Sequence, residues 1–218
     1  MKKIAKILLV LVASLLYLQS SAQTFGLKAG LNMATMFEED DYDTYSNDYS
    51  MNPGFHLGLT VGVPFNDFLS FESGLLLETK GMKYEDNILD VDVVVKANLF
   101  YLDIPLTLRA TTNLESGLKL YGAVGPYVGI GLSGKLKAKA EYQGETETEE
   151  EDINWGNDED MDDLKRIDMG LTFGGGIEIN AITLGISYDL GLSNISSYQD
   201  EGTTSQNRVL RFSVGYMF

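Results

Sequence analysis

The chain ends with the stretch Arg208-Val-Leu-Arg-Phe-Ser-Val-Gly-Tyr-Met-Phe218, in which two kinds of side chain alternate. The even positions are apolar or aromatic: Leu210, Phe212, Val214, Tyr216 and Phe218. The odd positions are mostly small or polar: Val209, Arg211, Ser213, Gly215 and Met217. Successive side chains of a strand point to opposite faces, so this pattern predicts a β-strand with one apolar side. A terminal strand needs a neighbour to cover its edge, and the first strand of the chain is the obvious one. The ending therefore predicts a closed antiparallel barrel.

Seven further alternating runs precede this strand, separated by turns and polar loops. They cover residues 24–34, 53–63, 68–84, a fourth run that reaches Arg109, 117–140, 166–179 and 182–192. Eight strands, with short turns on one side and longer loops on the other, are typical of outer-membrane barrels. Each run reaches the roughly 9–11 residues that a membrane-spanning strand requires. We predict an all-β fold, an eight-stranded antiparallel up-and-down transmembrane β-barrel formed by residues 23–218 as one domain.

Local features refine this prediction. The alternation fails across residues 97–101, which predicts a bulge there, and Asn180-Ala181 predicts a two-residue hairpin turn. In the fifth run the alternation is expected to place three lysines on the face opposite its apolar residues: Lys135, Lys137 and Lys139. Acidic loops at 35–52 and 141–165 are predicted to be extracellular. The second has twelve acids and no lysine or arginine between Glu141 and Asp163, so we expect it to be mobile.

Residues 1–22 have the pattern of a secretory signal peptide. A head with three lysines is followed by an apolar core and by the small residues Ser20-Ser21-Ala22. Its removal leaves 32 acidic and 13 basic residues, a formal net charge of −19. So acidic a chain is not expected to bind nucleic acid. There is no cysteine, which excludes disulfides and lipoprotein processing.

A soluble eight-stranded barrel of lipocalin type is the rival architecture. In such a barrel the less apolar face would be the water-exposed surface and would be dense in charge. Here that face carries mostly Gly, Ser, Thr and isolated charges, and most acids lie in the loops. Aromatic residues also gather near strand ends, as in the girdles of membrane barrels: Phe25, Phe55, Tyr188, Tyr216 and Phe218. These patterns favour the membrane.

Several segments resemble a known family. They are Phe25–Asn32, Pro53–Gly58, Tyr101–Leu106, Gly125–Gly129 and the ending from Asn207 to Phe218. Together they are similar to the PorT-like outer-membrane β-barrel family of Bacteroidetes, within the small OmpA/OmpX-type architecture. Tyr101–Leu106, which reads Tyr-Leu-Asp-Ile-Pro-Leu, is the most specific part. The resemblance implies an outer-membrane barrel and, in a few members, a role in secretion machinery. It implies no catalytic site.

Charged residues of both signs fall on the predicted lumen face. An eight-stranded barrel is only wide enough inside for side chains, so these charges are expected to form a packed ion-pair network that fills it. A proton or ion path is the sharper alternative. The predicted network comprises Lys28, Glu72, Glu78, Asp103, Arg109, Lys119, Asp168, Glu178, Asp189 and Arg211.

Other candidate sites are weak. The segment Gly129–Gly134 matches a GxGxxG dinucleotide fingerprint, but a strand continues where that motif needs a helix. Three aspartates have the early spacing of a calcium loop: Asp158, Asp160 and Asp162. An EF-hand is rejected because Asp163 replaces the required glycine and Met169 the bidentate glutamate. Loose binding of Ca²⁺ or Mg²⁺ by this loop stays open. The single histidine, His56, has no identifiable serine or aspartate partner and is interpreted as structural.

The expected function is therefore a structural or interaction role in the outer membrane, without catalysis and without a cofactor. The alternatives are a narrow channel for ions or small solutes, and a membrane-embedded enzyme that uses His56. The expected partners are outer-membrane lipid and lipopolysaccharide, the barrel-assembly machinery through the strand that ends at Phe218, and an envelope or secretion protein. Both termini are expected in the periplasm.

Overall fold

The computed structural model describes residues 23–88, 91–114, 117–198 and 202–218. The predicted signal peptide, residues 1–22, lies outside the described residues. Among those residues, no helix is long and apolar enough to cross a membrane.

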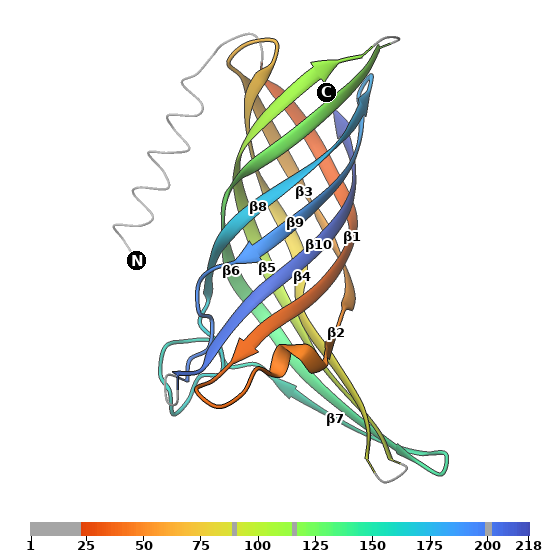
Figure 1. Cartoon of the computed structure of the whole chain (residues 1–218), viewed down its shortest axis with the longest axis vertical. Coiled ribbons are helices and arrows are strands. Elements are labelled where there is room, and N and C mark those ends of the chain that lie inside the picture. The colour runs from red at the N-terminus through yellow and green to blue at the C-terminus, as the bar shows by residue number, and fades with distance from the viewer. Residues whose placement is uncertain (1–22, 89–90, 115–116, 199–201) are drawn as a thin grey trace.

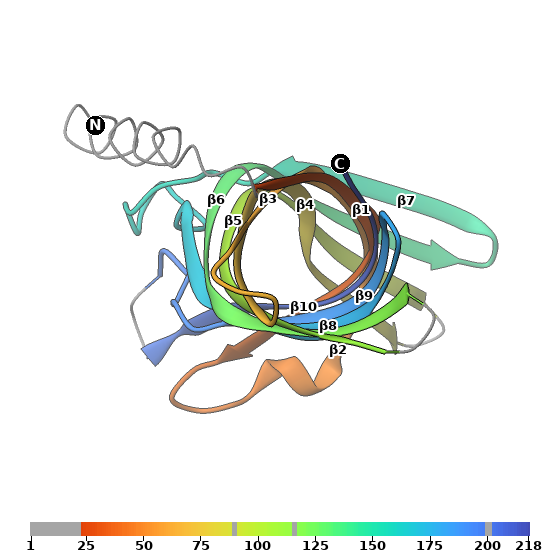
Figure 2. The same cartoon turned by 90° about the horizontal axis from the view of Figure 1, so that it is seen from above.

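Eight strands of the described chain form a closed ring in the order β1-β3-β4-β5-β6-β8-β9-β10, and β10 pairs with β1 (Figures 1 and 2). All neighbours are antiparallel, so the predicted eight-stranded up-and-down barrel is confirmed. The bounds are β1 Thr24–Glu39, β3 Asn52–Pro64, β4 Leu69–Ile88, β5 Val91–Asn113, β6 Leu118–Tyr142, β8 Ile167–Ile179, β9 Ile182–Gly191 and β10 Thr204–Met217. Outside the ring lie the 3₁₀ helix η1 Tyr45–Asp48, β2 Tyr49–Ser50, which pairs with β4, and β7 Glu145–Asp152, which pairs with β6.

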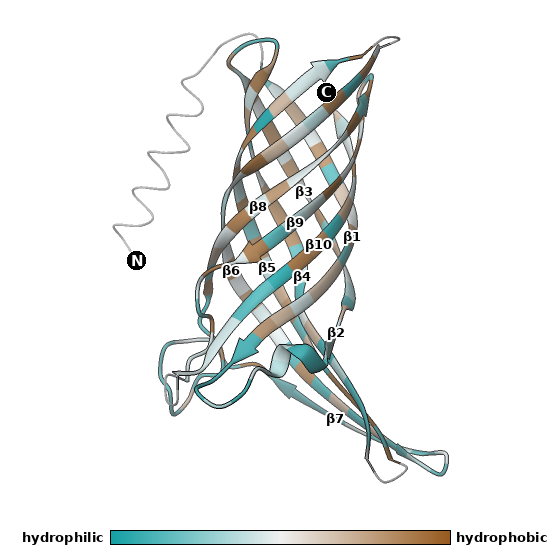
Figure 3. Ribbon diagram, viewed as in Figure 1, coloured by the Kyte–Doolittle hydropathy of each residue, from teal (hydrophilic) through white to brown (hydrophobic). Residues whose placement is uncertain are grey.

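The outward face of the ring is apolar. Every strand of the ring has large hydrophobic side chains that are about half exposed. Among them are Leu31, Leu59, Leu75, Leu108, Val124, Phe173, Ile186 and Val214. Figure 3 shows hydrophobic residues along the strands of the ring and hydrophilic residues over β7 and the segment around η1. Soluble monomers rarely expose a continuous apolar surface of this extent, so this belt is a lipid-facing surface.

The two ends of the barrel differ. Short turns join β3 to β4, β5 to β6 and β8 to β9 at the end where β10 finishes (Figure 1). The turn between β8 and β9 has two residues, as predicted, and Asn180 takes the positive φ (56°) that such turns need. The longer connections, η1, β2 and β7 lie at the opposite end, which we call the mouth.

The predicted bulge is present, but the extra residue is in β6. Phe100 of β5 pairs with Ser133, whereas Tyr101 pairs with Gly131, so Leu132 is skipped. Beyond it the inward-facing set of β6 changes parity, because one inserted residue turns every later side chain to the other face. The expectation of one unbroken alternation from Lys119 to Lys139 is therefore wrong, because Lys135, Lys137 and Lys139 lie beyond the bulge and face away from the side to which Lys119 and Tyr121 point.

The acidic segment 141–165 is not an irregular loop throughout. Residues 145–152 form β7, which pairs with the end of β6. The cause is a period-two pattern: Glu150 and Asp152 lie opposite Lys137 and Lys135, and ion pairs of 2.8 Å and 3.8 Å link these strands. The first acidic loop is also shorter than predicted, because β1 continues to Glu39.

Candidate functional site

Two cations and four carboxylates meet in the middle of the lumen. Lys80 on β4 places its Nζ 2.8 Å from Asp103 Oδ2, 3.0 Å from Asp168 Oδ2 and 3.4 Å from Glu78 Oε1. The guanidinium of Arg211, on β10, contacts Glu78 at 2.7 Å and Asp103 at 3.5 Å, and it pairs with Asp189. We call these six residues, all buried, the central cluster.

Neutral groups complete the central cluster. Tyr127 and Asn207 donate to Asp168 at 3.2 and 3.0 Å, and Thr172 donates to Asp189 at 2.6 Å. The Lys80 ammonium also lies 4.7 and 4.4 Å from the ring centroids of Tyr101 and Tyr127. Such partners are what buried charges require, because an unpaired charge in a dry interior is very costly. The cluster ties together β4, β5, β8, β9 and β10.

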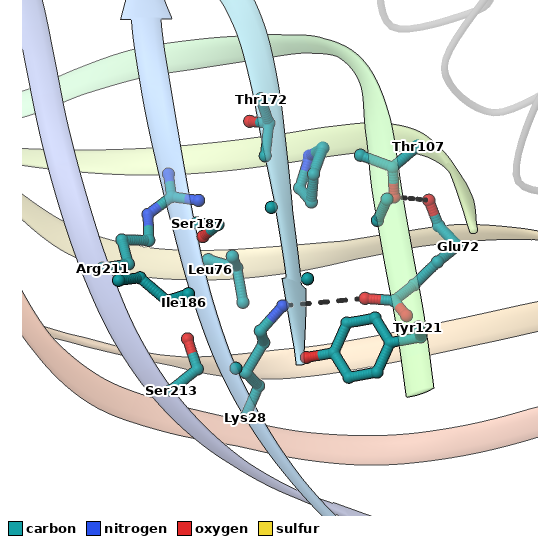
Figure 4. A pocket seen from close by; sticks show the side chains of 15 residues that line it. Lys28, Glu72, Leu76, Thr107, Tyr121, Thr172, Ile186, Ser187, Arg211 and Ser213 are labelled. Carbon is teal, nitrogen blue, oxygen red and sulfur yellow. Dashed lines mark hydrogen bonds and ion pairs between the residues drawn. The ribbon is translucent and has the colours of Figure 1, made fainter. Parts of the chain in front are cut away.

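A second group, the turn-end cluster, lies nearer the short turns. Arg109 bridges Glu72 at 3.0 Å and Glu178 at 2.7 Å, and its guanidinium lies 3.8 Å from the centroid of the Tyr121 ring. Lys119 reaches Glu178 at 2.7 Å, and Lys28 reaches Glu72 at 3.7 Å (Figure 4). The arginine is buried, whereas Lys28 and Lys119 are partly exposed toward the end of the barrel.

The structure places all ten residues of the predicted network in these two clusters. Sequence reasoning missed Lys80, although it follows Glu78 by two positions on the same face of β4 and could have been found by parity. Parity could not have shown which of these charges pair with one another, since Arg211 and Glu78, for example, are separated by 133 positions.

The clusters leave little free space. A cavity of ≈ 40 Å³ lies against Lys28, Glu72, Tyr121 and Ser213 (Figure 4), and one of ≈ 30 Å³ lies against Lys28, Arg109 and Thr183. Holding one water takes about 10–15 Å³ of such volume, so each cavity has room for no more than a few waters.

An apolar cluster closes the lumen at the mouth. Met36, Leu99, Tyr101 and Ile195 are buried together, and Ile153, Trp155 and Leu164 from the segment after β7 pack against them. The Trp155 ring lies edge-on to Tyr101, with centroids 5.5 Å apart. Gly131 makes room for it, because a Cβ there would lie 2.3 Å from the indole. The segment around Trp155 therefore packs against the barrel interior, whereas the sequence predicts an unpacked loop as far as Asp163. The glycines between Gly129 and Gly134 lie within strand β6, which continues through them. A dinucleotide-binding motif would need a helix at this point, so these glycines do not form one.

His56 does have partners, which the sequence did not identify. Its Nδ1 lies 2.7 Å from Asn32 Oδ1 and its Nε2 lies 3.0 Å from Ser213 Oγ. These are the contacts of a serine hydrolase triad with asparagine as third member. All three residues are buried, however, and the cavity beside Ser213 is small, at ≈ 40 Å³. The geometry supports a structural hydrogen-bonded chain that joins β1, β3 and β10.

The calcium-loop candidates turn their carboxylates toward their own backbone. Asp162 accepts from the N–H of Asp158 at 3.0 Å, and Asp158 accepts from the N–H of Asp160 at 3.1 Å. Within the described chain, the carboxylates whose oxygens converge to within 4.8 Å are Glu78, Asp103 and Asp189. Lys80 and Arg211 already supply the positive charge there.

Comparison with known proteins identifies one family model, described as outer membrane protein beta-barrel domain, which matches residues 19–197. No curated protein matches the chain. Similar solved structures include the attachment invasion locus protein Ail of Yersinia pestis in complex with the heparin analogue sucrose octasulfate (16% identity, 90% of this chain and 99% of that one, TM-score 0.40). They also include OprG from Pseudomonas aeruginosa (14%, 90% and 96%, 0.48) and Neisserial surface protein A (13%, 88% and 95%, 0.38).

Proposed function

We propose that this chain, which belongs to the outer membrane protein beta-barrel domain family, is a structural and interaction barrel rather than a channel or an enzyme. The observation that carries the proposal is the filled lumen. Two ion-pair clusters and the apolar cluster at the mouth fill it, and the two cavities beside them have room for no more than a few waters. What such a barrel offers to other molecules is its surface at the mouth.

The proposal includes an orientation. Outer-membrane barrels have short periplasmic turns and longer extracellular loops. By that rule the short-turn end and both termini lie in the periplasm, where the strand ending at Phe218 meets the barrel-assembly machinery. The mouth then faces outward, beside lipopolysaccharide. There the acidic segments either stand off the anionic sugars or bind them through divalent cations.

The proposal also includes membership of the PorT-like group of Bacteroidetes and a partner in the envelope or in secretion. Tyr101–Leu106, the most specific segment of that resemblance, contributes Tyr101 and Asp103, which surround Lys80. The segment thus takes part in filling the lumen, which is a structural use rather than a catalytic one.

Planar-bilayer recording tests the filled lumen. We expect the folded protein, recognised by different mobility on unboiled and boiled gels, to insert without resolved conductance steps, because conduction needs a continuous hydrated path. As a control, Trp155→Ala removes the largest ring of the apolar cluster at the mouth but leaves both ion-pair clusters, so it should also stay silent. Steady single-channel steps in the unmodified protein would refute the proposal and favour the channel.

An epitope inserted between Gln143 and Gly144 tests the orientation. Both residues have positive φ (49° and 86°) in the turn between β6 and β7, so an insertion there leaves the strand pairing intact. We expect antibody to bind it on intact cells. The matched insertion in the β3–β4 turn, at Asn66-Asp67, should be detected only after the outer membrane is opened. The reverse pattern would invert the topology.

A further inference from the structure

A four-stranded sheet extends beyond the barrel at the mouth. It consists of residues 82–88 of β4, 91–97 of β5, 134–142 of β6 and all of β7, and we call it the mouth sheet (Figures 1 and 2). Strand β7 is its outermost member. Within the described residues β7 pairs with β6 alone, so its second edge is open along eight residues. Half of the residues of such an edge direct their N–H and C=O groups outward, which makes it a template for another strand.

The two faces of the mouth sheet differ in charge balance. On one face, the ion-paired face, Glu150 and Asp152 of β7 lie opposite Lys137 and Lys135 of β6. Lys137 Nζ is 2.8 Å from Glu150, and its hydrogen bond holds the pKa of that carboxyl below the ordinary value. The acids of this face therefore have their counter-charges within the chain.

The other face has no such compensation. Four residues of β7 point to it at every second position, and we call them the glutamate row: Glu145, Glu147, Glu149 and Glu151. Opposite them on β6 are Tyr142, Ala140, Ala138 and Leu136, followed on β5 by Val93, Val95 and Ala97. No ion pair in the described part of the chain involves the glutamate row. A hollow of ≈ 420 Å³ lies along it, lined by Leu136, Ala138, Glu149, Glu150 and Glu151.

We propose that the open edge of β7 is a docking site for an extended cationic segment of a partner protein, which adds as a strand beside β7. Strand addition supplies affinity through main-chain hydrogen bonds, and side chains at alternate positions supply specificity. In an added strand, every second residue would lie beside the glutamate row, so the site selects lysine or arginine at alternate positions. The row disfavours a second copy of this chain, because two such edges would bring like charges together.

Two features favour an added strand over a free metal ion or a polycation that is held by charge alone. An apolar strip runs beside the glutamate row. Apolar side chains of a peptide can pack against this strip, whereas a hydrated metal ion cannot. The open edge also offers backbone groups at the 3.3 Å spacing per residue of a strand, so about eight residues of an extended chain match its length.

The inference names a partner class for the mouth and so deepens the proposed interaction role. It is tested on the full barrel in nonionic detergent with a fluorescent acetylated peptide of four Lys-Val repeats, by anisotropy. The double variant Glu147→Gln with Glu149→Gln removes two charges from the glutamate row. Glu150→Gln with Asp152→Asn removes two charges from the same strand on the ion-paired face. We expect the first pair to weaken binding by about tenfold and the second by less than about threefold, since each exposed charge pair contributes little.

A peptide N-methylated at alternate residues keeps its charge and loses donors along one edge, and it should bind at least about tenfold more weakly. Equal binding of this peptide would overturn strand addition. Equal effects of the two variant pairs would overturn the role of the glutamate row. Calcium binding that depends on Glu147 and Glu149 and displaces the peptide would make the row a metal site. A dimer dispersed by the peptide would make a second copy the occupant.

Failure of this inference is distinct from failure of the proposed function. Peptide binding is measured on the folded barrel in micelles and depends neither on conductance nor on orientation. If the peptide does not bind and the bilayer stays silent, only the docking site is lost. A conducting barrel refutes the proposed function whatever the peptide does.

Discussion

Replacing Arg211 by methionine should destabilise the folded barrel by about 3–5 kcal/mol, because it leaves buried carboxylates without their counter-charge. In the central cluster Arg211 contacts Glu78, Asp103 and Asp189, and all four side chains are buried. Without it, Lys80 alone would face four carboxylates. The measurement is the fraction of heat-modifiable barrel on gels across a urea series in lipid vesicles.

Arg208→Met is the matched control. Arg208 lies on the same strand, half-buried over the ring of Phe37 at 4.5 Å, and no ion pair joins it to the described residues. Its replacement should cost less than about 1 kcal/mol. Adding Glu78→Gln and Asp189→Asn to Arg211→Met should restore more than half of the lost stability, because Lys80 then faces two carboxylates instead of four. If the triple variant is no more stable than Arg211→Met, the loss comes from packing and the electrostatic explanation fails.

The sequence could predict which side of each strand faces inward, and hence which charges share the lumen. Parity is a local property, and Arg211, Asp189 and Asp103 each lie among apolar neighbours on their strands. It could not predict the division into a central and a turn-end cluster. That division depends on the stagger of the strands around the ring, which pairs His56 with Glu78 and Gly129 with Asp168.

Two local errors have the same origin. The bulge at Leu132 depends on how β6 pairs with β5, so nothing in the alternation of β6 alone reveals it. The like charges of residues 145–152 predict a solvated loop, yet the lysines of β6 offset two of those charges across the strands and the segment forms β7. His56 likewise gained its partners through pairing, since Gly30 of β1 lies opposite both His56 and Ser213. In each case the deciding contact joins residues on different strands.

An arginine on the lipid-facing side of β9 should destabilise the barrel in proportion to its depth. Ile182, Leu184 and Ile186 all point outward and are exposed by 50, 44 and 48%. Ile182 begins β9 at the short turn, whereas Ile186 lies near the centre of Ile182–Gly191. A strand rises about 3.3 Å per residue and is tilted by about 40°, so four residues span roughly 10 Å along the membrane normal. The apolar band is about 25 Å tall, which places Ile186 near its midplane and Ile182 near its rim.

We therefore expect Ile186→Arg to cost about 2–4 kcal/mol and Ile182→Arg about 0–1 kcal/mol, with Leu184→Arg between them. The three variants share one strand, one face and one new side chain, so depth is the quantity that differs. Unfolding in vesicles of fixed lipid composition measures the series. Equal costs at the three positions would mean that exposure to water rather than to lipid sets the penalty, and a cost that rises toward Ile182 would move the apolar band to the short-turn end. The expected gradient arises because an arginine near the rim can extend its guanidinium to the headgroups, whereas one at Ile186 has about 10 Å of hydrocarbon on either side.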